Sequence, residues 1–172
     1  SKVWNHPASP SIVVVDVDDI GNFGNAEAAQ VLDRVRRYMP RKVYLDTEIR
    51  TGLNPAADRA LARATSSFGR DLTLVVRSQN LDDFRPQSFK IPPRSIIGGS
   101  AIVLSSWSAN ALYYVESARY SIELGNRVYP TFSTDLAGMK SATWRSYYPD
   151  FFLDPDTIPQ VSGRPLLDGL IA

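Results

Sequence analysis

Five short apolar runs, spaced along most of the chain, set the strongest constraint on its fold. The first is SIVVVDVDDI at residues 11–20, where consecutive apolar β-branched residues precede a cluster of acids. Such a run is typical of a strand that is buried on both faces. Similar runs occupy residues 42–49, 72–78, 96–105 and 127–132. We therefore expect five strands, the first of them spanning residues 11–18.

Amphipathic helical patterns separate most of these runs. The first predicted helix starts at Asn25 as its N-cap and ends before Pro40, and the second spans residues 54–69. A third is predicted over 109–124, with Gly125 as its stop signal. Parallel neighbouring strands require crossover helices. The predicted fold class is therefore three-layer α/β, with a mainly parallel five-stranded sheet, helices on both faces and an irregular C-terminal arm.

The pattern divides the chain into three parts. Residues 1–10 form an N-terminal arm, residues 11–134 the α/β domain, and residues 135–172 a C-terminal helix followed by an irregular apolar tail. The helix is predicted over 135–148. Large apolar residues in the tail must be covered by the chain's own core or by a neighbouring subunit. We therefore expect self-association through the C-terminal arm.

Composition excludes several classes of protein. The chain has 19 Lys and Arg against 18 Asp and Glu, so a net charge of +1 offers no field for nucleic acid or an anionic membrane. The absence of Cys excludes thiol catalysis and zinc-finger or iron–sulfur sites, and the single His6 cannot form a multi-histidine site. We expect no membrane segment, no cofactor and a cytoplasmic location.

Two stretches, YLDTEIRTGLNPAADRALARA at 44–64 and IVLSSWSANALYYVESARYSIELGNRVYPTF at 102–132, carry a family resemblance. The chain is similar to TIR-like domains in the order of these features. A strand ends in Asp and is followed by a Glu-Ile-Arg-x-Gly-like loop and a helix, and a later strand ending in Ser precedes a Glu-bearing helix. The matching residues are Asp46, Glu48, Gly52, Ser105 and Glu116.

The resemblance implies either an NAD-cleaving glycohydrolase or its non-catalytic interaction relative. In the enzymatic case it assigns catalysis to Glu116, whose carboxylate contacts ribose and stabilises an oxocarbenium-like transition state. It assigns substrate binding to Asp46, Glu48, Gly52 and Ser105. NAD⁺ is then a substrate, and no metal is needed.

A second group of acids suggests another chemistry. Asp16 ends the first predicted strand, Asp58 lies in the second predicted helix, and Asp82 and Asp83 belong to the run SQNLDDF after the third strand. This arrangement resembles PIN/NYN-type nucleases, in which clustered carboxylates bind metal for phosphodiester hydrolysis. A third alternative is a structural assembly subunit of a larger particle, for example viral or phage, whose terminal arms dock onto neighbours.

Overall fold

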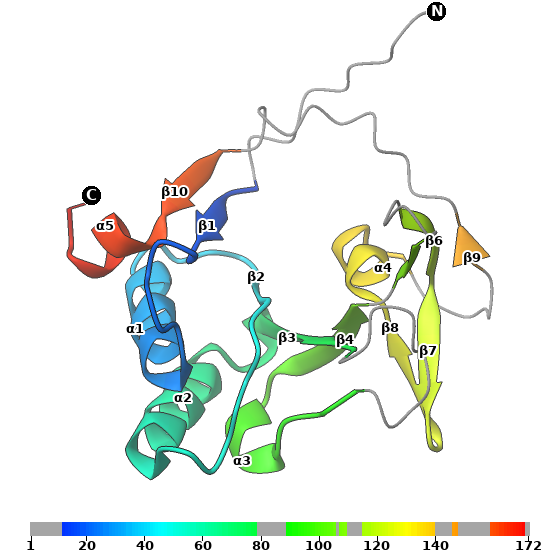
Figure 1. Ribbon diagram of the computed structural model, residues 1–172, viewed down its shortest axis with the longest axis horizontal. Helices are drawn as coiled ribbons and strands as arrows, with labels where there is room; N and C mark the ends of the chain where they lie inside the picture. Colours follow the sequence, from blue (N-terminus) through cyan, green and yellow to red (C-terminus); the bar gives the residue numbers. More distant parts are fainter. Residues whose placement is uncertain are drawn as a thin grey trace, which may run out of the picture.

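The computed structural model describes residues 12–78, 89–105, 107–109, 115–139, 146–147 and 159–170. The described chain is mixed α/β, with helices alternating with small sheets (Figure 1). Within these residues each sheet contains two or three strands, so the prediction of one five-stranded parallel sheet is wrong.

The central sheet contains β2 (Val43–Leu45), β3 (Leu72–Arg77) and β4 (Ala101–Ser105). All three strands are parallel and follow one another in chain order. They lie within three of the predicted runs, but the run at 96–105 is a strand only from Ala101, because a short helix ends at Ile97. Two helices, α1 (Asn25–Arg36) and α2 (Pro55–Phe68), confirm the first two helical patterns. The carboxyl ends of the three strands therefore meet at one edge of the sheet.

Both helices begin where local sequence provides a cap. The side chain of Asn54 accepts hydrogen bonds from the amides of Ala56 and Ala57 at the start of α2. In α1 the N-cap is Gly24, one residue before the predicted one. The backbone amide of Gly24 donates a hydrogen bond of 3.1 Å to the Glu27 carboxylate. This leaves the side chain of Asn25 free to bond elsewhere in the fold.

One face of the central sheet packs against α1 and α2. Alternation along β3 directs Leu72 and Leu74 to these helices, where both are fully buried. The short η1 (Gly69–Asp71) and α3 (Arg94–Ile97) extend this layer. The main core consists of Ala28, Ala29, Leu32, Leu45, Leu61, Ala64, Leu72, Leu74 and Ile96.

The opposite face of the sheet contacts α4 (Phe132–Leu136). Tyr44 alternates with the core residues of β2, and its ring lies edge-on to Phe132 with centroids 5.2 Å apart. Its hydroxyl donates a hydrogen bond of 2.8 Å to Asp135. Helices therefore lie on both faces of this sheet, with α3 and α4 on opposite sides in Figure 1.

The first and last described strands lie side by side (Figure 1). β1 (Val14–Asp16) pairs in parallel with β10 (Gln160–Ser162), and α5 (Gly163–Leu167) follows. Among the described pairs β1 has no ladder with β2. Leu166 is buried against Ile20 and residues of α1, so this part of the apolar tail covers the chain's own core.

Among the described residues of 109–124, antiparallel strands are found where a helix was predicted, and that prediction is wrong. These strands are β5 (Trp107–Ala109), β6 (Val115–Arg119), β7 (Ser121–Leu124), β8 (Arg127–Pro130) and β9 (Ser146–Tyr147). The predicted strand at 127–132 exists, but it forms a hairpin with β7 and reaches β4 only through a parallel bridge from Thr131 to Leu104. The helix predicted over 135–148 starts earlier and ends at Leu136.

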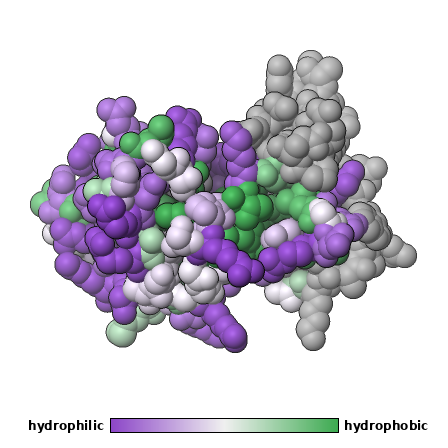
Figure 2. Space-filling model, turned by 90° about the horizontal axis from the view of Figure 1, so that it is seen from below, coloured by the Kyte–Doolittle hydropathy of each residue, from purple (hydrophilic) through white to green (hydrophobic). Residues whose placement is uncertain are grey.

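The space-filling view in Figure 2 shows how polarity is distributed over one face. The left part of this view is largely hydrophilic, and apolar side chains gather towards its middle. Amphipathic helices account for the hydrophilic part, because they turn their apolar stripe inward. None of the helices in the described ranges is long and apolar enough to cross a membrane.

Candidate ligand-binding site

Three polar side chains follow or end the parallel strands of the central sheet. Asp46 comes directly after β2, Arg77 ends β3, and Ser105 ends β4. In α/β sheets ligands bind outside the carboxyl ends of the strands, where helices and loops leave room for them. We call Asp46, Arg77 and Ser105 the strand-end cluster.

Arg77 and Asp46 form a bidentate ion pair within this cluster. The guanidinium donates from Nε and Nη2 to the two carboxylate oxygens, each at 2.7 Å. The hydrogen bond to Asp46 raises the pKa of Arg77, and the negative charge of Asp18 adds to that increase. Asp18, in the turn after β1, is therefore close enough to influence the cluster electrostatically.

Ser105 is the third member of the cluster. It pairs with Arg77 in the parallel register of β3 and β4, so both side chains lie on the same face of the sheet. Its exposed fraction is 9%, and no described residue hydrogen-bonds its hydroxyl. The residue is nearly buried, yet its hydroxyl is not among the buried atoms without a partner, so it is accessible, and a ligand can bond it beside the charged pair.

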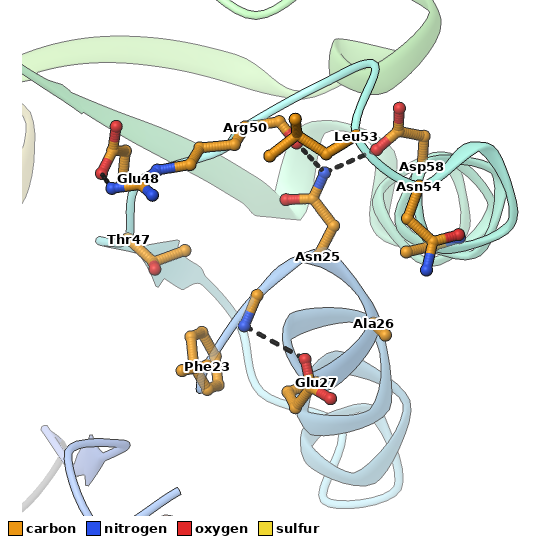
Figure 3. A pocket seen from close by; sticks show the side chains of 12 residues that line it. Phe23, Asn25, Ala26, Glu27, Thr47, Glu48, Arg50, Leu53, Asn54 and Asp58 are labelled. Atoms are coloured by element: carbon orange, nitrogen blue, oxygen red, sulfur yellow. Dashed lines mark hydrogen bonds and ion pairs between the residues drawn. The ribbon is translucent and has the colours of Figure 1, made fainter. Parts of the chain in front are cut away.

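A cavity of about 440 Å³ lies beside the segment that follows β2 (Figure 3). It is formed by the starts of α1 and α2 and by the loop between β2 and α2, and we call it the helix-start pocket. Its volume falls in the range of roughly 300–1,000 Å³ that is usual for small-molecule sites. Its lining residues are Phe23, Gly24, Asn25, Ala26, Glu27, Thr47, Glu48, Arg50, Leu53, Asn54, Ala57 and Asp58.

Asn25 joins the walls of the helix-start pocket. Its side-chain nitrogen donates to the backbone oxygen of Arg50 and to Oδ1 of Asp58, both at 2.7 Å. The amide of Gly52 donates to the other oxygen of Asp58 at 2.8 Å. These bonds fix the orientation of the Asn25 amide, and Figure 3 shows its oxygen directed towards the pocket.

An exposed ion pair extends across the pocket. Nη2 of Arg50 lies 2.6 Å from Oε2 of Glu48, and both side chains are more than 60% exposed. The hydrogen bond from Arg50 lowers the pKa of Glu48, and the charge of Lys90 contributes in the same direction. The pocket therefore presents a carboxylate and a guanidinium side by side.

The structure distributes the residues of the TIR-like resemblance over these two places. Asp46 and Ser105 belong to the strand-end cluster, whereas Glu48 lines the helix-start pocket. The amide of Gly52 donates a hydrogen bond to Asp58, which also lines that pocket. Glu116 is in β6, and the helix on which it was expected is absent. The pairs Ser108–Ser117 and Ala109–Val115 leave Glu116 at a bulge in that strand.

Two residues of these sites were not anticipated from the sequence. Arg77 follows a buried strand, and a single charged residue there looks like an ordinary strand end. The sequence predicts Asn25 only as a helix cap, because Asn is common at that position. In the fold its side chain connects α1 to the start of α2, a contact between residues 33 positions apart.

The acids of the nuclease resemblance form no metal site in the described part of the chain. Asp58 uses both carboxylate oxygens in structural hydrogen bonds, and Asp16 accepts one from the amide of Asp18. Asp82 and Asp83 lie outside the described residues. No group of three or more His, Cys, Asp or Glu side chains among the described residues is arranged to hold a metal ion.

Comparison with known proteins gives no relative: no family model, curated protein or solved structure matches the chain.

Proposed function

We propose that this protein binds a ribosylated small molecule at the strand-end cluster and cleaves its bond to the ribose, with NAD⁺ as the first substrate to test. The observation that supports this most directly is the hydroxyl of Ser105, unpartnered among the described residues, beside the pair of Arg77 and Asp46. Two of the three cluster residues are also positions of the TIR-like resemblance.

The cluster suits a ligand with neighbouring hydroxyl groups. A ribose hydroxyl both donates and accepts, so it can bond a carboxylate, a guanidinium and a serine hydroxyl. Arg77 uses Nε and Nη2 for Asp46, and none of the described residues binds its Nη1. Ser105 contributes a hydroxyl on the same face. Together these groups can orient a ribose at the edge of the sheet.

Cleavage of the glycosidic bond requires negative charge near the sugar ring. As the bond from ribose C1 to the nicotinamide nitrogen breaks, the electron pair leaves with neutral nicotinamide and positive charge develops on the sugar ring. Arg77 compensates the charge of Asp46, so the negative charge that stabilises the sugar comes from the Glu116 carboxylate that the resemblance names, and the charge of Asp18, which acts on Arg77, adds to it. Water then adds to C1 and releases one proton, which completes hydrolysis without a metal ion.

Glu116 remains the predicted catalytic carboxylate of the resemblance. Strand bulges are common beside active sites, because they redirect side chains. Its position at a bulge supports testing it with the cluster residues. If Glu116 acts on the transition state, removing its charge should lower the rate by about 10²–10³.

The test is release of nicotinamide from NAD⁺ by concentrated protein in the presence of EDTA. We expect activity from the native chain, a loss of at least tenfold in Asp46→Asn and Ser105→Ala, and a larger loss in Glu116→Gln. Asp71→Asn is the matched control, because Asp71 is exposed at the opposite end of β3. Absence of turnover, or equal loss in the control variant, would overturn the proposal.

The same protein should be assayed on single-stranded RNA with Mg²⁺ or Mn²⁺. Cleavage that depends on Asp16 and Asp82 and not on Asp46 would instead favour the metal-dependent nuclease.

A further inference from the structure

We propose that the helix-start pocket is a second binding site and that its ligand is an α-amino acid, held by its ammonium and carboxylate groups. The strand-end cluster does not use this pocket, so the proposal stands independently of the proposed function. It rests on three groups of atoms from residues that line the cavity, whose side chains Figure 3 draws.

The first group accepts hydrogen bonds. Asn25 is only 9% exposed, and both hydrogens of its amide nitrogen are used by Arg50 and Asp58. Its oxygen therefore has a fixed orientation, accepts from no described residue and is directed into the cavity. Oε1 of Glu48 is a second acceptor without a described partner. An ammonium group satisfies acceptors of this kind.

The second group donates hydrogen bonds. The amides of Asn25 and Ala26, at the start of the 12-residue α1, have no acceptor among the described residues, because the N-cap Gly24 has no side chain. Arg50 adds guanidinium N–H groups that its single bond to Glu48 does not use. Helix-start amides together with a guanidinium bind a carboxylate well.

The balance of charge favours a ligand that carries both signs. A simple anion would meet three carboxylates in the lining, those of Glu27, Glu48 and Asp58. A simple cation would leave Arg50 and the helix-start amides unsatisfied. A zwitterion satisfies both groups, and the exposed Glu48–Arg50 pair is held weakly enough to exchange partners.

The third group is apolar. Phe23 and Leu53 line the cavity, and Leu53 is 80% exposed, so its side chain is available to cover a ligand. The volume of about 440 Å³ leaves room for the side chain of an amino acid once its charged groups are bound. The pocket therefore has a polar end for the backbone of the ligand and an apolar part for its side chain.

The first experiment screens the twenty L-amino acids against the ¹⁵N-labelled full chain by NMR. We expect saturable shifts of the Asn25 and Ala26 amides with at least one of them. Calorimetry then compares the best amino acid with its decarboxylated amine and its deaminated acid. Each analogue should bind at least tenfold more weakly. Absence of saturable binding, or equal binding of either analogue, would overturn the proposal.

Substitutions then locate the site. Glu48→Gln and Arg50→Gln should each weaken binding at least tenfold, whereas the control Arg70→Gln should leave it unchanged, because Arg70 lies in η1 away from the pocket. Dispersed NMR spectra verify that each variant is folded. Equal loss in the control, or no loss in either pocket variant, would contradict the assignment. Nicotinamide release tests the strand-end cluster separately, so either proposal can fail alone.

Discussion

Arg77 at the end of β3 binds Asp46 after β2 through two hydrogen bonds of 2.7 Å, and this pair joins neighbouring parallel strands at their carboxyl ends. The side chain of Arg77 is 60% exposed and that of Asp46 is 34% exposed. Such an exposed pair contributes little to stability, about 0–1 kcal/mol. It does, however, fix two charged side chains in one orientation beside Ser105, which is what a binding site requires.

Arg77→Lys should therefore affect binding more than folding. Lysine keeps the charge but cannot form the two parallel bonds of a guanidinium. We expect NAD⁺ binding, measured by calorimetry, to weaken at least tenfold, while the free energy of urea unfolding changes by less than about 1 kcal/mol. The control is Arg70→Lys. Unchanged NAD⁺ affinity in Arg77→Lys would show that the bidentate geometry is unnecessary.

Asn25→Ala should destabilise the fold. It removes two hydrogen bonds of 2.7 Å and leaves Asp58 and the backbone oxygen of Arg50 with fewer donors in a partly buried place. We expect a loss of about 1–3 kcal/mol in urea unfolding. Gln30→Ala, at an exposed position of the same helix, should change it by less than about 0.5 kcal/mol. Equal effects would contradict the role given to Asn25.

Gly163→Ala should disturb the junction of β1, β10 and α5. A Cβ atom at this position would lie 2.7 Å from the backbone oxygen of Asp16 and 2.8 Å from Cδ1 of Ile20. Overpacking of this kind costs about 1–3 kcal/mol. Gly21→Ala is the matched control, since nothing lies within 4 Å of its Cβ position. Thermal unfolding of both variants gives the comparison, and a harmless Gly163→Ala would argue against this docking.

Stability should fall at high pH through Tyr44. Burial, together with the hydrogen bond to Asp135, raises the pKa of Tyr44 from 10.0 to about 12. A raised folded-state pKa adds stability that is complete below pH 10 and is lost as the pH rises towards about 12. Urea unfolding across this interval should show the loss, and Tyr44→Phe should reduce it. An identical pH profile in the variant would exclude Tyr44 as the cause.

The pairing of β10 with β1 should weaken in acid. The hydroxyl of Ser162 donates to Asp19 at 2.5 Å and lowers the pKa of Asp19 from 3.8. A lowered pKa adds stability above pH 3.8 that is lost as the pH falls through the folded-state value. The protection factors of the β10 amides, which correct for the pH dependence of intrinsic exchange, should therefore fall below pH 3.8. They should fall less in Ser162→Ala, because that variant lacks the hydrogen bond at every pH. A decrease of equal size in both proteins would refute this account.

Local patterns predicted correctly the part of the fold that local physics controls. The runs at 42–49 and 72–78 are strands, and Asn54 with Pro55 starts α2 as expected. The residues 109–124 were misread because apolar residues at helical spacing also occur in strands rich in aromatic and β-branched residues. Gly125 with Asn126, taken as a helix stop, is the two-residue turn of the β7–β8 hairpin, where Gly125 has a φ of 61°.

The sequence by itself determined β2, β3, α1 and α2, and that Asp46 and Ser105 lie at strand ends, because burial and capping act over a few neighbouring residues. Only the tertiary structure decided that β10 pairs with β1, that Arg77 binds Asp46, and that Asn25 connects the starts of two helices. Each of these contacts joins residues that are 31 or more positions apart. Pairings over such distances depend on chain closure and on competition among all available partners, which no local pattern records.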